Sequence, residues 1–414
     1  MRAMKDSGIP WIGEIPENWE VKRLKQESIF INGFAFDSED FKIDEGVRVI
    51  RIGDIGLKAD FENCVRAITN SSILKPYRIE DGDILIAMSG ATTGKCCIVD
   101  KSEEAYINQR VGIIRSDIRK IIYYSLQTPY FMEFVNLNNA GSAQPNISSK
   151  AIGEFPILSI PPTEQQKIAE FLDRKCAEVD EMIALQEQII EELKAYKQSV
   201  ITEAVTKGLN PAAPMRDSGI DWIGTIPEHW EVSKVKWECA IMDYLREPIS
   251  AENRKNELGL YDYYGASGVI DKIDDYNVDD KVLLIGEDGA NLVMRNLPLL
   301  YKAEGKFWVN NHAHILKPLA NNCYSYMAYM LEAGDYTHYI TGSAQPKLSQ
   351  DNIKNFIIPM PRDYTEQQAI ADYLDDKCAD IDSLIQTKQS KIDSLKEYKK
   401  SIIYEYVTGK LEVK

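Results

Sequence analysis

The sequence predicts a mixed α/β protein, in which two α/β domains are joined by two long helices that form a coiled coil, with a pseudo-two-fold internal repeat. Three observations lead to this fold class. The start and the end of the first half of the chain recur in the second half. Each recurring end continues into a long segment with apolar residues at steps of three and four. Short strand-like runs lie between each start and end.

The repeat consists of matching blocks in the two halves. MKDSGIPWIGEIPENWEVKRLK at 4–25 returns as MRDSGIDWIGTIPEHWEVSKVK at 215–236, with 15 of 22 positions identical. GSAQPNISSKAIGEFPI from 141 returns as GSAQPKLSQDNIKNFII from 342, and TEQQKIAEFLDRKCAEVD from 163 returns as TEQQAIADYLDDKCADID from 365. Between the blocks, 32–55 and 242–276 show no visible similarity. A repeated framework with different inserts suits two different recognition domains in a fixed relation; the alternative is a duplication that has drifted.

The repeated ends predict two long helices. No Gly or Pro occurs from Gln165 to about Val205, and an apolar stripe follows helical spacing: Ile168, Leu172, Cys176, Val179, Ile183, Ile190, Leu193, Tyr196, Val200 and Ala204. The second stripe is Ile370, Leu374, Cys378, Ile381, Ile385, Ile392, Leu395, Tyr398, Ile402 and Tyr406, and polar Gln186 and Lys388 interrupt the two stripes at matching positions. We expect the stripes to pair as a coiled coil. The alternative is that each helix packs on its own half as a core helix.

Helix-end signals place the domain boundaries. Thr163 with Gln166, and Thr365 with Gln368, have the spacing of a capping box. Gly208 and Gly409 lie just past the expected helix ends, where a left-handed glycine commonly stops a helix, and Pro211 and Pro214 follow in a linker. The expected organisation is a first domain at 1–160, a central long helix and linker at 161–210, a second domain at 211–361 and a C-terminal long helix at 362–414.

The inserts read as short strands separated by polar loops. The strand-like runs are RVIRIGDI, GDILIAMSG, CCIVD and RVGIIRS in the first half, and KVLLIGEDG, FWVNNHAHILK and NFIIPMP in the second. They predict compact α/β domains. In the repeated blocks, Trp11, Trp19, Trp222 and Trp230 are expected to anchor the arms to the scaffold as core aromatics.

Composition argues against several classes of protein. With 44% hydrophobic and 27% charged residues, the 414-residue chain has the composition of a soluble globular protein. No apolar run approaches the roughly 18 residues of a membrane span, and the N-terminus lacks the apolar stretch of a secretory signal, so a cytoplasmic location is expected. Seven cysteines without CxxC spacing indicate neither a zinc site nor a disulfide framework. The net charge of −16 argues against a nucleic-acid partner, unless basic residues gather on one face or partner subunits supply phosphate contacts.

Several motifs together resemble one family. They are SGIPWIGEIPENWEVKRL and its copy, NGFAF, SGATTGK, YINQRVGII, and GSAQPNIS leading into IPPTEQQKIAEFLD. The chain resembles the specificity subunits of type I restriction-modification systems over essentially its whole length. The resemblance implies two target-recognition domains, held apart by two antiparallel conserved helices, each of which reads one part of a bipartite target in double-stranded DNA. Because the inserts differ, we predict an asymmetric target. A helix of 41 residues at about 1.5 Å per residue is roughly 60 Å long. This length would set the length of the unspecified spacer between the two parts of the target.

The resemblance also implies partners and no catalysis by this chain. The partners are two copies of an adenine N6-methyltransferase subunit, which bind S-adenosylmethionine, and restriction/translocase subunits, which bind ATP and Mg. No cofactor or metal is expected in this chain, and no membrane association. The sequence contains neither an Asn/Asp-Pro-Pro-aromatic tetrapeptide nor a Gly-x-Gly cofactor loop. GATTGKC at 90–96 resembles a phosphate-binding loop, but it has three residues between its glycines and Cys96 where a hydroxyl belongs.

Polar loops of the inserts supply candidate DNA contacts, because Asn and Gln suit adenine and Arg and Lys suit guanine in the major groove. In the first half the candidates are Ser89, Thr92, Thr93, Lys95, Asn108, Gln109, Arg110, Ser142 and Gln144. In the second half, where the motif match is looser, they are Glu287, Asp288, Asn291, Arg295, Asn310, Asn311, His312, Ser343, Gln345 and Lys347. The alternative for each is a loop-capping hydrogen bond, expected for about half of them. For the shared GSAQP motif, the alternative is that it positions the protein on the DNA backbone rather than choosing the sequence.

Two other classes of function stay open. An acidic coiled-coil interaction scaffold with no direct DNA role fits the charge but not the motifs. The second is an enzyme with an unrecognised active site, such as a nuclease. Metal-dependent cleavage of DNA by the isolated chain would favour it. Salt-sensitive specific binding that requires a methyltransferase partner would favour the specificity subunit.

Overall fold

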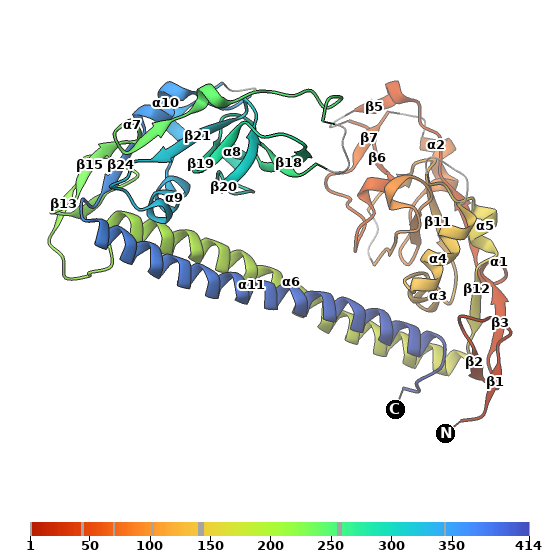
Figure 1. Cartoon of the computed structure of the whole chain (residues 1–414). Coiled ribbons are helices and arrows are strands. Elements are labelled where there is room, and N and C mark those ends of the chain that lie inside the picture. The colour runs from red at the N-terminus through yellow and green to blue at the C-terminus, as the bar shows by residue number, and fades with distance from the viewer. Residues whose placement is uncertain are drawn as a thin grey trace. The chain divides into compact units, whose positions relative to one another are not determined.

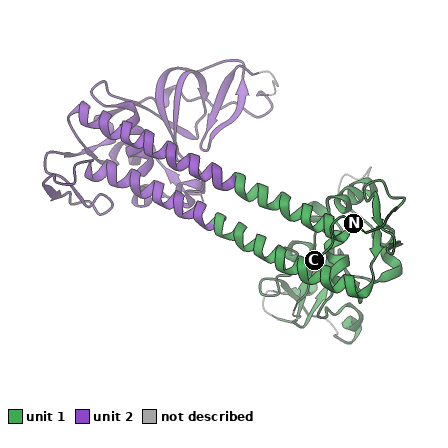
Figure 2. Cartoon of the chain, turned by 90° about the horizontal axis from the view of Figure 1, so that it is seen from below, with its two compact units in different colours: residues 1–187, 390–414 green, residues 188–389 purple. Residues whose placement is uncertain are grey.

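The computed structural model describes residues 2–42, 45–68, 71–100, 103–139, 145–254, 259–342 and 345–413. The chain divides into two compact units (Figure 2). Unit 1 comprises residues 1–187 and 390–414, and unit 2 comprises residues 188–389. Each unit therefore contains one insert, its repeated framework and a part of each long helix.

The insert of unit 1 forms two four-stranded sheets (Figure 1). The first has the order β4-β11-β8-β9 and is antiparallel. The second has the order β10-β6-β7-β5, in which β10 and β6 run parallel. The strands are β4 (Ile29–Asn32), β5 (Phe41–Lys42), β6 (Val47–Ile50), β7 (Val65–Ala67), β8 (Ile84–Ala87), β9 (Cys96–Ile98), β10 (Ala105–Ile107) and β11 (Val111–Arg115). The helices are α1 (Leu24–Glu27), α2 (Ser71–Leu74), α3 (Arg119–Leu126), α4 (Pro129–Asn138) and α5 (Ser149–Gly153).

Strand β8 lies at the centre of the unit 1 core, because all four of its residues are buried. Side chains alternate between the two faces of a strand. Ile84 and Ile86 accordingly pack in one core cluster with residues of α3 and α4, whereas Leu85 and Ala87 pack in another with residues of β6 and β10. Burial on both faces fixes the position of the end of β8. The 88–95 loop, which follows this end, carries candidate residues.

The insert of unit 2 forms one six-stranded sheet with the order β16-β21-β19-β20-β17-β18. Its pairs are antiparallel except for β17 and β20, which run parallel. The strands are β16 (Cys239–Ile241), β17 (Tyr261–Gly265), β18 (Gly268–Ile273), β19 (Val278–Gly286), β20 (Leu300–Val309) and β21 (Ala313–Pro318), with a separate pair β22 (Ile340–Thr341) and β23 (Lys347–Leu348). The helices are α7 (Val235–Glu238), α8 (Asn291–Met294), α9 (Tyr324–Ala333) and α10 (Gln350–Asn355).

The repeated blocks form equivalent strand pairs at the start and end of the two units. In unit 1, β1 (Met4–Asp6) pairs with β2 (Glu14–Pro16), and β3 (Glu20–Arg23) pairs with β12 (Pro156–Ser159). In unit 2, β13 (Met215–Asp217) pairs with β14 (Thr225–Pro227), and β15 (Glu231–Lys234) pairs with β24 (Ile357–Met360). The registers correspond, since Met4 faces Pro16 and Met215 faces Pro227. The predicted fold class, a repeated framework with different α/β inserts and two long helices, is confirmed.

The two long helices are α6 (Pro162–Lys207) and α11 (Tyr364–Val407), which lie side by side in each unit (Figure 2). In unit 1, Lys399 Nζ lies 2.7 Å from Asp180 Oδ2, and in unit 2, Lys197 Nζ lies 2.7 Å from Asp382 Oδ2. Moving from residue 180 to 197 along α6 moves the partner back by the same number of residues along α11. The helices are therefore antiparallel, and the two ion pairs are copies of each other under the internal repeat.

The helix seam is buried largely as predicted, with two exceptions. Cys176, Val179, Cys378 and Ile381 of the expected stripes are buried. The parts of both helices that belong to a unit also join the core of that unit, since Leu172 and Ile403 pack with Trp19 in unit 1. Coiled-coil packing and core packing therefore occur together. The prediction was wrong for Tyr196 and Tyr398, which are 56% and 51% exposed. The seven-residue spacing from Ile190 and Ile392 leads to Lys197 and Lys399 instead, and these two lysines are half-buried in the ion pairs between the helices.

The expected capping boxes were wrong. Helix α6 begins at Pro162, whose fixed φ suits a first helical position, so Thr163 lies inside the first turn rather than at the N-cap. Gln166 donates instead to Glu170 Oε1, and Gln368 donates to Asp372 Oδ1. Asp363 caps α11, because its Oδ1 accepts from the Thr365 backbone N–H at 2.8 Å. The glycine stops are confirmed, since Gly208 and Gly409 have φ of 71° and 72°.

Two tryptophans attach the framework to the first turns of the helices, as predicted. Trp19 is 0% exposed and Trp230 is 1% exposed. The indole Nε1–H of Trp19 donates to Glu164 Oε2 at 3.1 Å, and that of Trp230 donates to Glu366 Oε1 at 3.0 Å. Trp11 stacks on Phe155, and Trp222 stacks on the corresponding Phe356.

Candidate nucleic-acid interface

The candidate residues of unit 1 lie on loops that meet at one edge of the first sheet. Strand β8 ends and antiparallel β11 begins at this edge. The backbone N–H of Met88 donates to Arg110 O at 2.9 Å, and the N–H of Ile147 donates to Met88 O at 2.9 Å. Met88 therefore joins the 88–95 loop, the 108–110 turn and the 145–147 segment into one three-loop junction.

Several polar side chains of this junction hold the loops themselves. Thr93 Oγ1 donates to Gly90 O at 2.7 Å, and Asn108 Oδ1 accepts from the Gln109 N–H at 2.6 Å. Thr92 is half-buried, and its Oγ1 lies 3.4 Å from Ile52 O. Gly33 of the NGFAF segment allows the close approach, because a Cβ there would lie 1.9 Å from Asn108 O.

Other side chains of the same junction are accessible. Lys95, Gln109 and Arg110 are exposed. Ser89 is 5% exposed, and its hydroxyl has no hydrogen-bond partner among the described residues. Ser142, Gln144 and, in unit 2, Ser343 lie outside the described residues. A DNA contact by any of these candidates stays a prediction, and the exposed cations fit that role better than the loop-holding threonine.

Unit 2 forms the same junction on a different sheet. The N–H of Glu287 donates to His312 O at 2.8 Å, and the N–H of Leu348 donates to Glu287 O at 2.7 Å. The N–H of Gly289 donates to Pro346 O at 3.0 Å, just as the N–H of Gly90 donates to Pro145 O at 2.9 Å in unit 1. Met88 and Glu287 therefore occupy equivalent places, and Pro145 and Pro346 accept equivalent hydrogen bonds.

Asn291, Arg295 and Asn310 of unit 2 serve their own loops. Asn291 Nδ2 donates to Leu297 O at 3.0 Å while its Oδ1 accepts from the Leu297 N–H at 2.8 Å. Arg295 adopts a left-handed φ of 53° and donates to Glu332 O at the end of α9. Asn310 is 4% exposed, and its Oδ1 accepts from the His312 N–H. Asn311, His312 and Gln345 are exposed at the junction.

A charged network underlies the junction of unit 2. The buried Glu287 carboxylate contacts Lys347 Nζ at 2.9 Å and also Arg246 Nη1. Burial alone would raise the pKa of Glu287, but the hydrogen bonds from Lys347 and Arg246 outweigh it and hold that pKa below its usual value. Lys347 remains 54% exposed. In the second acidic candidate, Asp288, the carboxylate Oδ2 lies 2.7 Å from His312 Nδ1.

His314 extends this network into the core. It is 0% exposed, its Nε2 donates to Leu348 O at 2.7 Å, and its Nδ1 lies 2.6 Å from Asp243 Oδ2. A carbonyl oxygen only accepts, so Nε2 carries a proton. His314 thereby ties β21 to β23 beneath Lys347. Among the described residues, no group of three or more His, Cys, Asp or Glu side chains is arranged to hold a metal ion.

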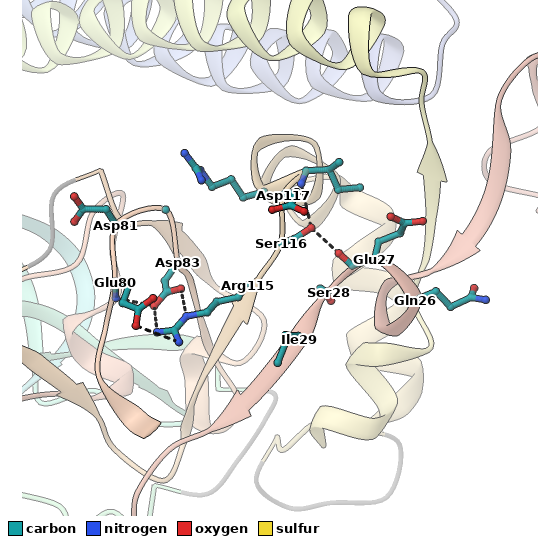
Figure 3. Close-up of a pocket in the computed structure, with 13 residues that line it drawn as sticks. Gln26, Glu27, Ser28, Ile29, Glu80, Asp81, Asp83, Arg115, Ser116 and Asp117 are labelled. Atoms are coloured by element: carbon teal, nitrogen blue, oxygen red, sulfur yellow. Dashed lines mark hydrogen bonds and ion pairs between the residues drawn. The ribbon is translucent and has the colours of Figure 1, made fainter. Parts of the chain in front are cut away.

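A polar pocket of about 570 Å³ lies at the opposite end of β8 and β11 (Figure 3). Arg115, the last residue of β11, donates from Nε to Asp83 Oδ1 at 2.7 Å and lies 3.5 Å from Glu80. Glu27, Asp81 and Asp117 add further carboxylates to the lining. Because carboxylates outnumber cations there, this pocket repels phosphate, and the three-loop junction is the better candidate for contacts to DNA.

Sequence reasoning missed two polar residues of the junctions. Asn146 is exposed beside Ser89, and it occupies the position that corresponds to Lys347. Aligning the two GSAQP blocks would have found it. Arg246 lies in a segment without a counterpart in the first half, so no sequence signal linked it to Glu287.

The fold and the two junctions define a class of protein, in which one repeated framework carries two unlike recognition domains. A family model described as "Type I restriction modification DNA specificity domain" matches residues 16–195 and 227–397. These ranges cover most of both halves. The chain belongs to this family, that of the type I restriction-modification specificity subunits.

Individual relatives agree with the family match. The chain is 26% identical over 430 residues to the putative type I restriction enzyme MjaX specificity subunit of Methanocaldococcus jannaschii, covering 97% of this chain and 96% of that protein. It is 32% identical over 213 residues to the type I restriction enzyme EcoBI specificity subunit of Escherichia coli, covering 50% of this chain and only 42% of the relative.

A solved structure supports the fold. It is described as "Structural basis underlying complex assembly and conformational transition of the type I R-M system" and matches with a TM-score of 0.70 over 96% of this chain and 99% of that one. At 14% identity, this likeness concerns the fold alone. No described helix is both long and apolar enough to span a bilayer.

Proposed function

We propose that this chain is the DNA-reading subunit of a type I restriction-modification complex, and that each unit reads one part of an asymmetric bipartite target. One observation carries the proposal: the two units hold the same three-loop junction through the same backbone hydrogen bonds, but they present different side chains there. Equal junctions with equal side chains would read an inverted repeat. Junctions with different side chains read two different half-sites.

The chemistry is assigned to partner subunits, and this chain itself is proposed to be non-catalytic. Two methyltransferase subunits with S-adenosylmethionine would methylate adenine N6 within the target, and restriction/translocase subunits with ATP and Mg would act on unmodified DNA. The net charge of −16 supports a division of labour in which partners supply much of the phosphate contact.

The test is co-expression of the chain with its methyltransferase subunit in a methylation-free host, followed by genome-wide mapping of N6-methyladenine. An asymmetric bipartite motif that disappears when this chain is omitted is the expected result. A well-assembled complex that gives no motif, or a motif that persists without this chain, would refute the proposal.

The acidic charge favours one alternative, an interaction scaffold with no direct DNA role. Such a scaffold would assemble the methyltransferase subunits, but it would leave the methylated motif unchanged when junction residues are substituted. The same mapping experiment on variants of Arg110 and Lys347 therefore separates the two functions.

A further inference from the structure

One exposed position differs between the units inside an otherwise matching segment. After the shared GSAQP motif, unit 1 continues with Asn146, Ile147 and Ser148, and unit 2 continues with Lys347, Leu348 and Ser349. Ile147 and Leu348 are both apolar, and the two serines are identical. The only change of chemical character is therefore amide to ammonium, at position 146 or 347.

The backbone on the junction side of this position forms matching contacts in both units, although Lys347 also pairs with Thr341 of β22, whereas the Asn146 N–H donates to Asn139 Oδ1 at 3.0 Å. The residue before it accepts from Gly90 or Gly289, and the residue after it donates to Met88 or Glu287. Asn146 forms an antiparallel bridge with Ser89, and Lys347 forms one with Asp288. Ser148 and Ser349 then cap α5 and α10, because their hydroxyl oxygens accept from the backbone N–H groups of Ala151 and Asn352.

Burial decides which side chains face solvent. Ile147 and Leu348 are 1% and 0% exposed, so they anchor the segment in the core. Successive side chains on an extended segment point to opposite sides, and Asn146 and Lys347 are accordingly exposed. The difference between Asn and Lys therefore does not serve core packing. It changes what the junction offers to a ligand.

We infer that Asn146 and Lys347 are equivalent base-choosing positions, with Asn146 selecting adenine and Lys347 selecting guanine in their respective half-sites. The inference rests on the proposed function. An Asn amide can accept from adenine N6 and donate to adenine N7, whereas a Lys ammonium donates to guanine O6 and N7.

The junction of unit 2 holds a carboxylate within reach of Lys347, and the junction of unit 1 holds no charge at the equivalent residue. Lys347 Nζ lies 2.9 Å from Oε1 of the buried Glu287, which limits the directions that the ammonium group can take. In unit 1 the equivalent place is held by Met88, which is 9% exposed and has no charge to direct a cation. Met88 packs with Ile147 in the core, so Lys347 has a buried carboxylate within reach and Asn146 has no charged counterpart of it at the equivalent residue. Glu287 acts as a positioning residue.

The experiment maps N6-methyladenine in the co-expressed complex for wild type, Asn146→Lys, Asn146→Ala and Lys347→Asn. Asn146→Lys should replace adenine by guanine at one base of one half-site, and Lys347→Asn should make the reverse change in the other half-site. Asn146→Ala should relax the same base, lowering discrimination there by roughly 5- to 150-fold. Lys150→Asn, an exposed change on α5 close to the junction, is the matched control and should keep the motif.

The outcomes separate the inference from the function on which it rests. If wild type gives no motif, the proposed function fails. If wild type gives a bipartite motif that all three junction variants preserve, position 146/347 chooses no base and the inference fails. Assembled variant complexes that methylate the unchanged motif more weakly would also overturn it, because that pattern identifies a backbone-positioning role.

Discussion

Replacing Trp230 by Phe tests how the repeated framework is attached to the long helices. The indole is 1% exposed and donates to Glu366 Oε1 at 3.0 Å. Phe keeps an aromatic ring in the core but removes the donor and part of the packed volume. A hydrogen bond to a charged group contributes about 1.5–3 kcal/mol. We discount this to about 1 kcal/mol, because Glu366 is 28% exposed and also contacts His229.

The lost ring volume adds about 1–2 kcal/mol, which is a fraction of a full Trp truncation. The total of about 2–3 kcal/mol corresponds to a fall in Tm of roughly 4–12 °C for a unit of this size. Thermal unfolding followed by far-UV circular dichroism measures it. Trp237→Phe makes the same chemical change at a side chain that is 64% exposed, and it should shift Tm very little. Equal shifts for the two variants would refute the anchoring role of Trp230.

Three further predictions concern a buried carboxylate, an arginine bonded to the end of a helix, and two buried thiols. Burial alone would raise the pKa of Glu238, but hydrogen bonds from Ser233, Asn322 and Arg362 hold it below the usual 4.5, so its ionised form stabilises unit 2 above that pH. The free energy of unfolding should thus fall more steeply below about pH 4.5 for wild type than for Glu238→Gln, and parallel acid titrations would contradict this. Arg295→Ala should lower the free energy of unfolding by about 1–2 kcal/mol, because the hydrogen bonds to the end of α9 are lost. The methylated motif should stay unchanged, and an altered motif would instead place Arg295 at the DNA. Burial raises the pKa of Cys97 and Cys239 to about 12, so alkylation at pH 8 followed by mass spectrometry should label them only after unfolding, and rapid native labelling would be inconsistent with their burial.

Local patterns predicted the framework well, because helix periodicity and glycine stops act over a few residues. The stripe through Cys176 and Val179, and the stops at Gly208 and Gly409, follow from such short-range rules. Prediction failed where the sequence offered two neighbouring positions for the same role. Helix α6 starts at Pro162, before Thr163, and Lys197 rather than Tyr196 takes the seam position seven residues after Ile190.

By itself the sequence determined the repeat, the two long helices, the difference between the inserts and the family, since each of these is written in contiguous residues. Only the tertiary structure decided which polar residues share a junction. Segments 88–95, 108–110 and 145–147 are separate in the chain, and backbone hydrogen bonds at the end of a buried strand bring them together. The pairing of Lys347 and Arg246 with Glu287 is likewise non-local. Such contacts depend on sheet order and register, and no short-range sequence pattern encodes them.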